Sequence, residues 1–233
     1  MAARRARVLW LLAAGAGLIG IALVAKRKVD TAAKEPSKLP PRKGHVTPGS
    51  REPFMALVRR AARRHRELRE SAPGGNPVAL LGGLLQHESS WDPLAESPTG
   101  ALGLGQFTGA GRAEVRRLVN EEEDLRLRFR DTPGLAAKLG ALTRRDMTAP
   151  ELAVEAAALL LTGNLRRRRG HVEAALTEYN AGGAAAGLVV QHGTHAAAKP
   201  SLERLGPKEK SQSPTYAPRV LVEVSKLRAA GVA

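Results

Sequence analysis

The stretch HESSWDPLAESPTGALGLGQF, from His87 to Phe107, marks the place where a hydrophobic helical run gives way to a loop rich in Gly, Ser and Pro. Before this stretch, Asn76 is a favourable N-cap and Pro77 suits the first position of a helix. Pro93 cannot continue a helix, so the run must end before it. The sequence therefore predicts a largely apolar helix that starts at Pro77 and leads directly into a long loop.

One carboxyl group occupies an unusual place in this helix. Leu81, Leu85 and Glu88 lie at i, i+4 and i+7, which puts Glu88 on the apolar stripe of the helix, close to its end. Partial burial there would raise its pKa and favour the protonated form, as a general acid requires. On spacing alone, a Glu that points into solvent from a helix end is the competing interpretation.

The loop that follows combines glycine with uncharged polar side chains. Gly100, Gly103 and Gly105 allow the backbone to come close to another helix or to a ligand. Ser97, Gln106 and the backbone amides of the loop offer hydrogen-bonding groups without charge, which suits the hydroxyl and acetamido groups of sugars. An ordinary Gly-rich connection is the alternative.

The rest of the chain favours an all-α domain of about six or more helices, with no convincing strand and no internal repeat. A capping box from Thr148 to Glu151 predicts the start of a long Ala/Leu helix. Residues 183–213 are predicted to be irregular. The remaining helices are expected over 54–68, from a cap at Thr108 to about Val119, over 171–181, and from Tyr216 to Leu227.

The N-terminal part is predicted to be a membrane anchor and a linker. A basic N-terminus at 1–7 precedes the uncharged stretch 8–25, which is long enough to span a bilayer as a helix. A cleaved signal segment is the alternative, although cleavage after Ala25 would place Leu23 at the −3 position. Residues 26–52 are rich in Pro and Lys and predict a solvated, disordered linker. The folded domain is expected over 53–230.

Charge and composition limit the classes of partner. The chain has 233 residues and a formal net charge of +15, which favours a polyanion: nucleic acid, anionic lipid or an acidic cell-wall polymer. Three Phe, two Tyr and two Trp supply few stacking platforms, and no recognition-helix signature is present, so specific nucleic-acid binding is not expected. Without Cys there is no disulfide framework and no thiolate metal site.

Three ordered motifs carry a resemblance to a known family. The segments HESSWDPLAESPTGALGLGQFTGAG, AVEAAALLLTGNLRRRRGHVEAALTEYNAG and SPTYAPRVLVEV resemble the soluble lytic transglycosylase (SLT) domain, within the lysozyme-like superfamily. The resemblance implies a goose-type, lysozyme-like multi-helix domain. The family usually has Met where Gly105 stands, Ala where Glu178 stands, and a smaller aliphatic residue where Phe107 stands.

The resemblance implies a site and a reaction. Glu88 corresponds to the catalytic acid, and Ser97 and Gln106 to residues that line the sugar groove. Tyr179 and Asn180 are expected opposite Glu88, with the Tyr179 hydroxyl orienting or tuning the carboxyl, and Tyr216 is expected to approach the site. The implied reaction cleaves the β-1,4 bond between N-acetylmuramic acid and N-acetylglucosamine in peptidoglycan and forms a 1,6-anhydromuramoyl product.

The resemblance also implies partners and a location. Peptidoglycan glycan strands are the expected partner, with no metal and no cofactor. The domain is expected in the periplasm, anchored in the bacterial inner membrane through residues 8–25, or secreted if residues 1–25 are removed. Two alternatives stay open: a hydrolytic muramidase on the same fold, and a catalytically degenerate, membrane-tethered wall-binding protein. The sequence leaves the oligomeric state open.

Overall fold

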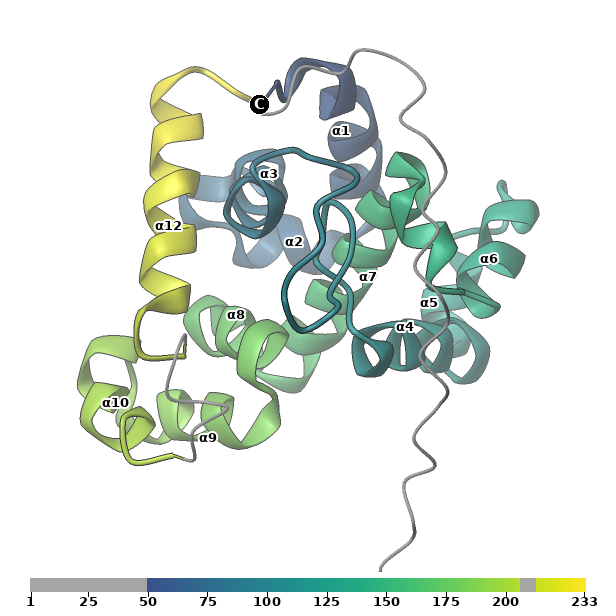
Figure 1. Cartoon of the computed structure of the whole chain (residues 1–233). Coiled ribbons are helices and arrows are strands. Elements are labelled where there is room, and N and C mark those ends of the chain that lie inside the picture. The colour runs from purple at the N-terminus through teal and green to yellow at the C-terminus, as the bar shows by residue number, and fades with distance from the viewer. Residues whose placement is uncertain (1–49, 206–212) are drawn as a thin grey trace, which may run out of the picture. The chain divides into compact units, whose positions relative to one another are not determined.

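The computed structural model of the protein describes residues 50–205 and 213–233, and this part of the chain is built from helices and loops with two isolated β-bridges (Figure 1). The predicted all-α class is confirmed for these residues. The α-helices are α1 Met55–Arg64, α2 Arg66–Ser71, α3 Pro77–Ser89, α4 Gly109–Glu121, α5 Glu123–Leu127, α6 Pro133–Gly140, α7 Pro150–Arg167, α8 Val172–Ala181, α9 Gly183–His192, α10 His195–Leu202 and α12 Ser213–Ala229. Three short 3-10 helices, η1 Glu52–Phe54, η2 Pro73–Gly75 and η3 Arg145–Thr148, lie between them.

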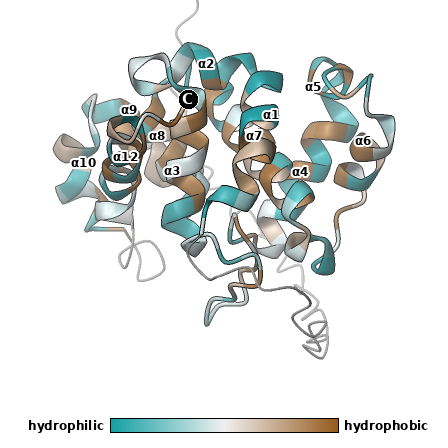
Figure 2. Cartoon of the chain, turned by 90° about the horizontal axis from the view of Figure 1, so that it is seen from above, coloured by the Kyte–Doolittle hydropathy of each residue, from teal (hydrophilic) through white to brown (hydrophobic). Residues whose placement is uncertain are grey.

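Helix α7 forms the centre of the packing. It contacts α1, α2, α4 and α8, and every residue from Leu152 to Leu165 is buried. A helix that is apolar on all sides is stable only when other elements surround it. Figure 2 shows hydrophobic residues concentrated along α3 and α7, the two helices of which long runs are buried. The Leu- and Ala-rich composition therefore becomes a closely packed helical core.

Helix α12 packs against α3, and Figure 1 shows it beside α3, which is seen there nearly end-on. The contact depends on Gly83, because a Cβ atom at that position would lie 2.8 Å from the backbone nitrogen of Val224. After α12 the chain returns to the first helices: Arg59 Nε donates to the Ala233 carbonyl at 2.8 Å, and Asn76 Nδ2 donates to the Val232 carbonyl at 2.6 Å. These contacts fix the last helix against the N-terminal half of the domain.

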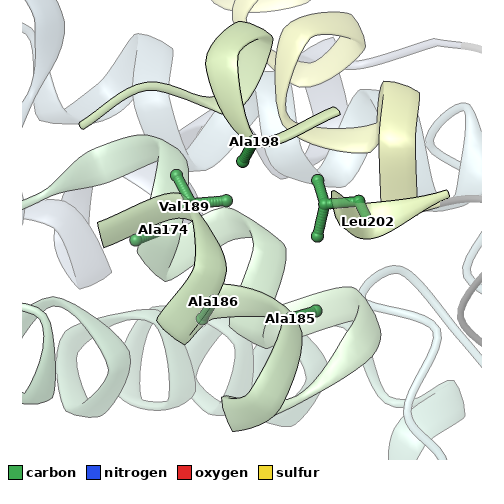
Figure 3. Packing of buried hydrophobic residues seen from close by; sticks show 6 residues of the cluster. All are labelled: Ala174, Ala185, Ala186, Val189, Ala198 and Leu202. Carbon is green, nitrogen blue, oxygen red and sulfur yellow. The ribbon is translucent and has the colours of Figure 1, made fainter. Parts of the chain in front are cut away.

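The prediction that residues 183–213 are irregular is wrong for most of that segment. Helices α9 and α10 pack with α8 around a small second core, drawn in Figure 3. Thr194 caps α10 by accepting a hydrogen bond from the Ala197 N–H. Short alanine-rich helices bury small side chains and show little contrast between their faces, so sequence periodicity does not reveal them. The buried members of this core are Ala174, Ala185, Ala186, Val189, Ala198 and Leu202.

Two local predictions need correction. The helix expected over 54–68 is interrupted at His65, which has an extended backbone and a fully buried ring packed edge-on against Phe129 at 6.1 Å. The capping box is also wrong: α7 has Ala149 at its N-cap, and Thr148 Oγ1 instead donates to the carbonyl of Arg145. At His65, the burial of the ring against Phe129 is a contact that the local pattern does not show.

Three helix boundaries confirm the sequence prediction. Asn76 caps α3 with Pro77 in the first turn, Thr108 caps α4 by accepting from the Gly111 N–H, and α8 spans the predicted segment near 171–181. Helix α3 ends at Ser89, where the left-handed conformation of Ser90 stops it before Pro93 is reached.

The predicted anchor at 8–25 and almost all of the predicted linker at 26–52 lie outside the described residues. Among the helices that are described, none combines the length and the apolar character needed to cross a bilayer. The predicted boundaries at 1–7, 8–25, 26–52 and 53–230 stay predictions.

Candidate active site

Helix α3 delivers Glu88 to the start of the loop. The residues from Val78 to Leu85 are all buried, and the helix ends one residue after Glu88. The burial holds the backbone of the last turn in place while the Glu88 side chain stays partly exposed. The carboxyl therefore extends from a rigid element into accessible space, which is the arrangement that a reacting group needs.

The loop after α3 is held by its own polar side chains. Ser97 Oγ accepts a hydrogen bond from the Ala101 N–H at 3.0 Å, and Gln106 Nε2 donates to the carbonyls of Ala95 and Gly103, both at 3.0 Å. Gly103 has a φ of +78°, and a Cβ atom there would lie 1.9 Å from the carbonyl oxygen of Met147. The expected close approach of the backbone is thus present, and the neighbour is η3.

A cavity of about 540 Å³ opens between this loop and helices α3, α4, α7 and α8. It brings together five of the six predicted site residues: Glu88, Ser97, Gln106, Tyr179 and Asn180. The other residues that line it are Thr99, Ala101, Gly105, Phe107, Thr108, Ala110, Gly111 and Leu160. Among these described lining residues, Glu88 supplies the only carboxyl group.

Tyr216, from α12, is the hydrogen-bond partner of this carboxyl. Its hydroxyl donates to Glu88 Oε1 through a short contact, and its ring meets the edge of His87 at a centroid distance of 5.0 Å. The sequence analysis expected the Tyr179 hydroxyl to orient or tune the carboxyl. In the structure the Tyr179 hydroxyl donates to the Gly105 carbonyl at 2.9 Å, so the orienting hydrogen bond comes from Tyr216, and the tuning role of Tyr179 stays a prediction. Tyr179 still faces the cavity and lies close enough to Glu88 to feel its charge.

The electrostatics of the site follow from its burial. Burial raises the pKa of Glu88 from 4.5 to about 7, and the hydrogen bond from Tyr216 opposes this rise. Burial and the nearby carboxylate raise the pKa of both Tyr179 and Tyr216 well above the ordinary value, so both hydroxyls stay protonated. Near neutral pH, comparable fractions of Glu88 are thus protonated and ionised.

Other carboxyl groups near the loop already have structural roles. Asp92 Oδ1 accepts a hydrogen bond from the Leu94 N–H within a turn, and Glu96 pairs with Arg144 at 2.5 Å. Neither residue lines the cavity. No group of three or more His, Asp or Glu side chains in the described part of the chain is arranged to hold a metal ion.

A second cavity, of about 680 Å³, extends the first one along α4 and α8. The two share the lining residues Thr108, Ala110, Gly111, Leu160, Tyr179 and Asn180, so together they form one groove. At the far end, Glu178 pairs with Arg167 at 2.9 Å, and Arg167 pairs with Glu114 at 2.8 Å. Glu178, a departure from the family pattern, is therefore part of a charged rim.

Sequence reasoning did not single out several of the lining residues, and Leu160 and Phe107 are the large apolar ones among them. Leu160 belongs to the apolar α7, where nothing in the sequence distinguishes a residue that faces a cavity from one in the core. The sequence marks Phe107 only as a residue that differs from the smaller aliphatic one usual in the family. Its ring lies 6.3 Å from that of Tyr179, and a Cβ atom on Gly105 would lie 2.6 Å from its Cε2 atom. The absence of a side chain at Gly105 therefore makes room for the ring of Phe107.

Comparison with known proteins supports one family. The family model described as "Transglycosylase SLT domain" matches residues 69–199, which is more than half of the chain. The match includes α3, the loop, α4 and α7–α9, and it ends before α12, the helix that carries Tyr216. No curated protein and no solved structure matches the chain significantly.

Proposed function

Since the chain belongs to the transglycosylase SLT domain family, whose members are typically lytic transglycosylases acting on peptidoglycan, we propose that it is a peptidoglycan lytic transglycosylase with Glu88 as its single acid and base. The observation that carries the proposal is the cavity in which Glu88, with its pKa raised to about 7, is the sole carboxyl among the described lining residues. The goose-type, lysozyme-like label for the fold is part of the same proposal.

In the first step, Glu88 acts as a general acid. Its proton passes to the glycosidic oxygen of N-acetylglucosamine as the bond between that oxygen and C1 of N-acetylmuramic acid breaks. A carboxyl with a pKa near the working pH is suited to this transfer, because a large fraction is protonated and the proton is still readily donated. The acetamido group of the substrate stabilises the positive charge that develops at C1.

In the second step, the same group acts as a base. The Glu88 carboxylate accepts the proton of the muramoyl C6 hydroxyl, the C6 oxygen bonds to C1, and a 1,6-anhydro ring closes. The carboxyl is thereby returned to its acidic form, and no water is consumed. The hydrogen bond from Tyr216 supports both steps, because it holds Oε1 in place and stabilises the carboxylate that exists between them.

Hydrolysis by a muramidase is the main alternative. Most glycosidases that use water as the final acceptor place two carboxyl groups on opposite sides of the scissile bond. Asp92 and Glu96 are engaged elsewhere and line neither cavity. Glu114 and Glu178 line the second cavity, and both are paired with Arg167. A mechanism with one carboxyl fits these residues better.

Product analysis separates the two reactions. The purified full-length chain is incubated with peptidoglycan sacculi in H₂¹⁸O, and the soluble muropeptides are examined by mass spectrometry. The proposal predicts anhydromuramoyl ends without ¹⁸O. Reducing ends that carry ¹⁸O would establish the muramidase, and the absence of any soluble product would favour the degenerate wall-binding protein.

The proposed substrate suggests a location. Peptidoglycan lies outside the inner membrane, so we propose that residues 8–25 anchor the chain there with the domain in the periplasm. Protease added to spheroplasts is then expected to degrade the domain. Complete protection of the domain would contradict this orientation.

A further inference from the structure

A third cavity, of about 400 Å³, has no lining residue in common with the groove that contains Glu88. Helix α1 forms one side, and the segment from the end of α5 to the start of α6 forms the other. Its lining is dominated by arginine, so we call it the arginine basin. The residues that line it are Arg60, Arg63, Arg64, Leu127, Arg128, Arg130, Asp131 and Thr132.

Buried carboxylates hold two of these arginines in place. Glu155 is 1% exposed and accepts a short hydrogen bond from Arg64, whose guanidinium also lies 4.8 Å from the centroid of the Phe129 ring. Arg128 donates two hydrogen bonds to Glu67, at 2.6 and 2.8 Å. Such paired, fixed guanidinium groups lose little conformational entropy when a ligand uses their remaining N–H groups.

The other arginines of the basin are bound more weakly. Arg60 donates to Glu151 at 2.6 Å on the exposed surface. Arg130 comes within 3.8 Å of Asp131, but both side chains are mostly in solvent, where such a pair contributes little. Arg63 is exposed and forms no ion pair or hydrogen bond with the residues that the structure describes. Arg64 and Arg128 are the anchored pair of the basin. Arg63 and Arg130 are therefore available to bind a ligand that lies beside this pair.

One of the residues that line the basin, Thr132, carries a polar group without a partner in the described part of the chain. The Oγ1 atom of Thr132 is buried and has no hydrogen-bond partner among the described residues. Thr132 is also the N-cap of α6, yet its side chain forms no cap hydrogen bond. The N-terminus of a helix carries a partial positive charge and favours an anion. An anion bound in the basin would complement this helix end.

We propose that the arginine basin is a binding site for a phosphate group. A carboxylate has two oxygens in one plane, which a single guanidinium satisfies, whereas a phosphate presents oxygens in several directions. The basin offers guanidinium groups from two separate elements, α1 and the segment between α5 and α6, which matches the second geometry. The phosphate is either inorganic phosphate in solution or the headgroup phosphate of an anionic lipid.

The test uses the full-length chain with Arg63 and Arg130 both replaced by Gln. These two side chains anchor nothing in the core, so the variant is expected to fold and to clear peptidoglycan at the rate of the unchanged protein. The matched control replaces Arg69 and Arg145, two exposed arginines outside the basin, by Gln. Both variants lose the same net charge, so non-specific attraction is equal in the two.

Calorimetric titration with sodium phosphate at low ionic strength gives the decisive readout. We expect saturable binding that becomes at least about tenfold weaker in the Arg63→Gln, Arg130→Gln variant and changes less than about twofold in the control. Equal weakening in both variants, or the absence of saturable binding to the unchanged protein, would overturn the proposal.

Vesicles distinguish the two sources of phosphate. The variants are sedimented with phosphatidylcholine vesicles that contain or lack phosphatidylglycerol. If the headgroup is the natural ligand, the basin variant binds the anionic vesicles more weakly than the control does. If inorganic phosphate is the ligand, the two variants sediment equally while their phosphate affinities still differ.

Discussion

At the scale of single residues, the hydrogen bond between Tyr216 and Glu88 adjusts the acidity of the site. Burial favours the neutral carboxyl, whereas the Tyr216 hydroxyl stabilises the charged form and so lowers the pKa. The two effects act in opposite directions on the same proton. The position of the pKa near 7 thus depends on a side chain that follows Glu88 by more than a hundred residues in the sequence.

Tyr216→Phe is predicted to raise the pKa of Glu88 above 7. The acidic form then persists to higher pH, so the alkaline limb of the kcat/KM profile shifts upward, and the maximum rate falls because Oε1 is no longer held. A pH-rate profile from 5 to 9, with circular dichroism to confirm folding, measures both effects. An alkaline limb that stays in place or moves downward would contradict the role given to Tyr216.

Gly105 and Phe107 are predicted to be coupled. In Gly105→Ala, the new Cβ would meet Phe107 Cε2 at 2.6 Å and the Tyr179 hydroxyl at 2.9 Å, so activity should fall at least about tenfold. Phe107→Leu leaves room for this Cβ and should restore part of the loss in the double variant. A double-mutant cycle on sacculus digestion measures the coupling, which we expect to be about 1 kcal/mol or more. Strictly additive effects would show that the two residues act independently.

At the scale of secondary-structure elements, the contact between α3 and α12 forms the site as well as the core. Glu88 comes from the end of α3 and Tyr216 from the first turns of α12. The two helices approach each other closely at Gly83, where the backbone of Val224 leaves no space for a side chain. The spacing of these helices therefore also sets the distance between acid and tyrosine.

Gly83→Ala is predicted to reduce both stability and activity. The added methyl group forces α12 away from α3, which should lower the free energy of unfolding by about 1–3 kcal/mol and separate Tyr216 from Glu88. Gly187→Ala is the matched control, since that helical glycine has no neighbour within 4 Å of the added Cβ and alanine favours helices. Urea denaturation of both variants measures the difference. Equal stabilities would contradict the packing described for α3 and α12.

The sequence predicts some elements well and others poorly, for physical reasons. The start of α3 is signalled by Asn76 and Pro77, and the place of Glu88 by the apolar spacing before it. Helices α9 and α10 give no such signal, because their contrast between faces is weak. The pairing of Tyr216 with Glu88 was not predictable from local pattern, since it requires α12 to dock on α3.

At the scale of the whole molecule, the partly buried carboxyl of Glu88 affects the stability of the fold. The unfolded chain loses this proton near pH 4.5, whereas the folded protein keeps it until about pH 7. Between these values the folded state binds more protons than the unfolded state, so this group makes stability fall as the pH rises. The loss of folding stability that comes from this group is complete above pH 7 and absent below pH 4.5.

Glu88→Gln is therefore predicted to stabilise the protein at pH 8 by up to about 3 kcal/mol, the free energy that corresponds to the rise in pKa. The difference in the free energy of unfolding between the variant and the unchanged protein should become smaller as the pH falls from 7 to 4.5. Denaturant unfolding of both proteins at several pH values measures this difference. A difference that is independent of pH would show that Glu88 is ionised normally in the folded protein.

The charge of the whole molecule also affects interpretation of any binding experiment. With a net charge of +15, the chain will associate weakly and in a salt-sensitive way with many polyanions, nucleic acid included. Such binding identifies neither the substrate nor the ligand of the arginine basin. Only comparisons at equal net charge, or measurements of chemical products, distinguish a specific site from this background.

The central claim is that Glu88 performs both proton transfers, and the rate of sacculus digestion by Glu88→Gln tests it most directly. Glutamine keeps the shape of the side chain and removes the transferable proton, so the rate should fall at least about hundredfold while the variant stays folded. A variant that releases anhydromuropeptides at the rate of the unchanged protein would contradict the claim.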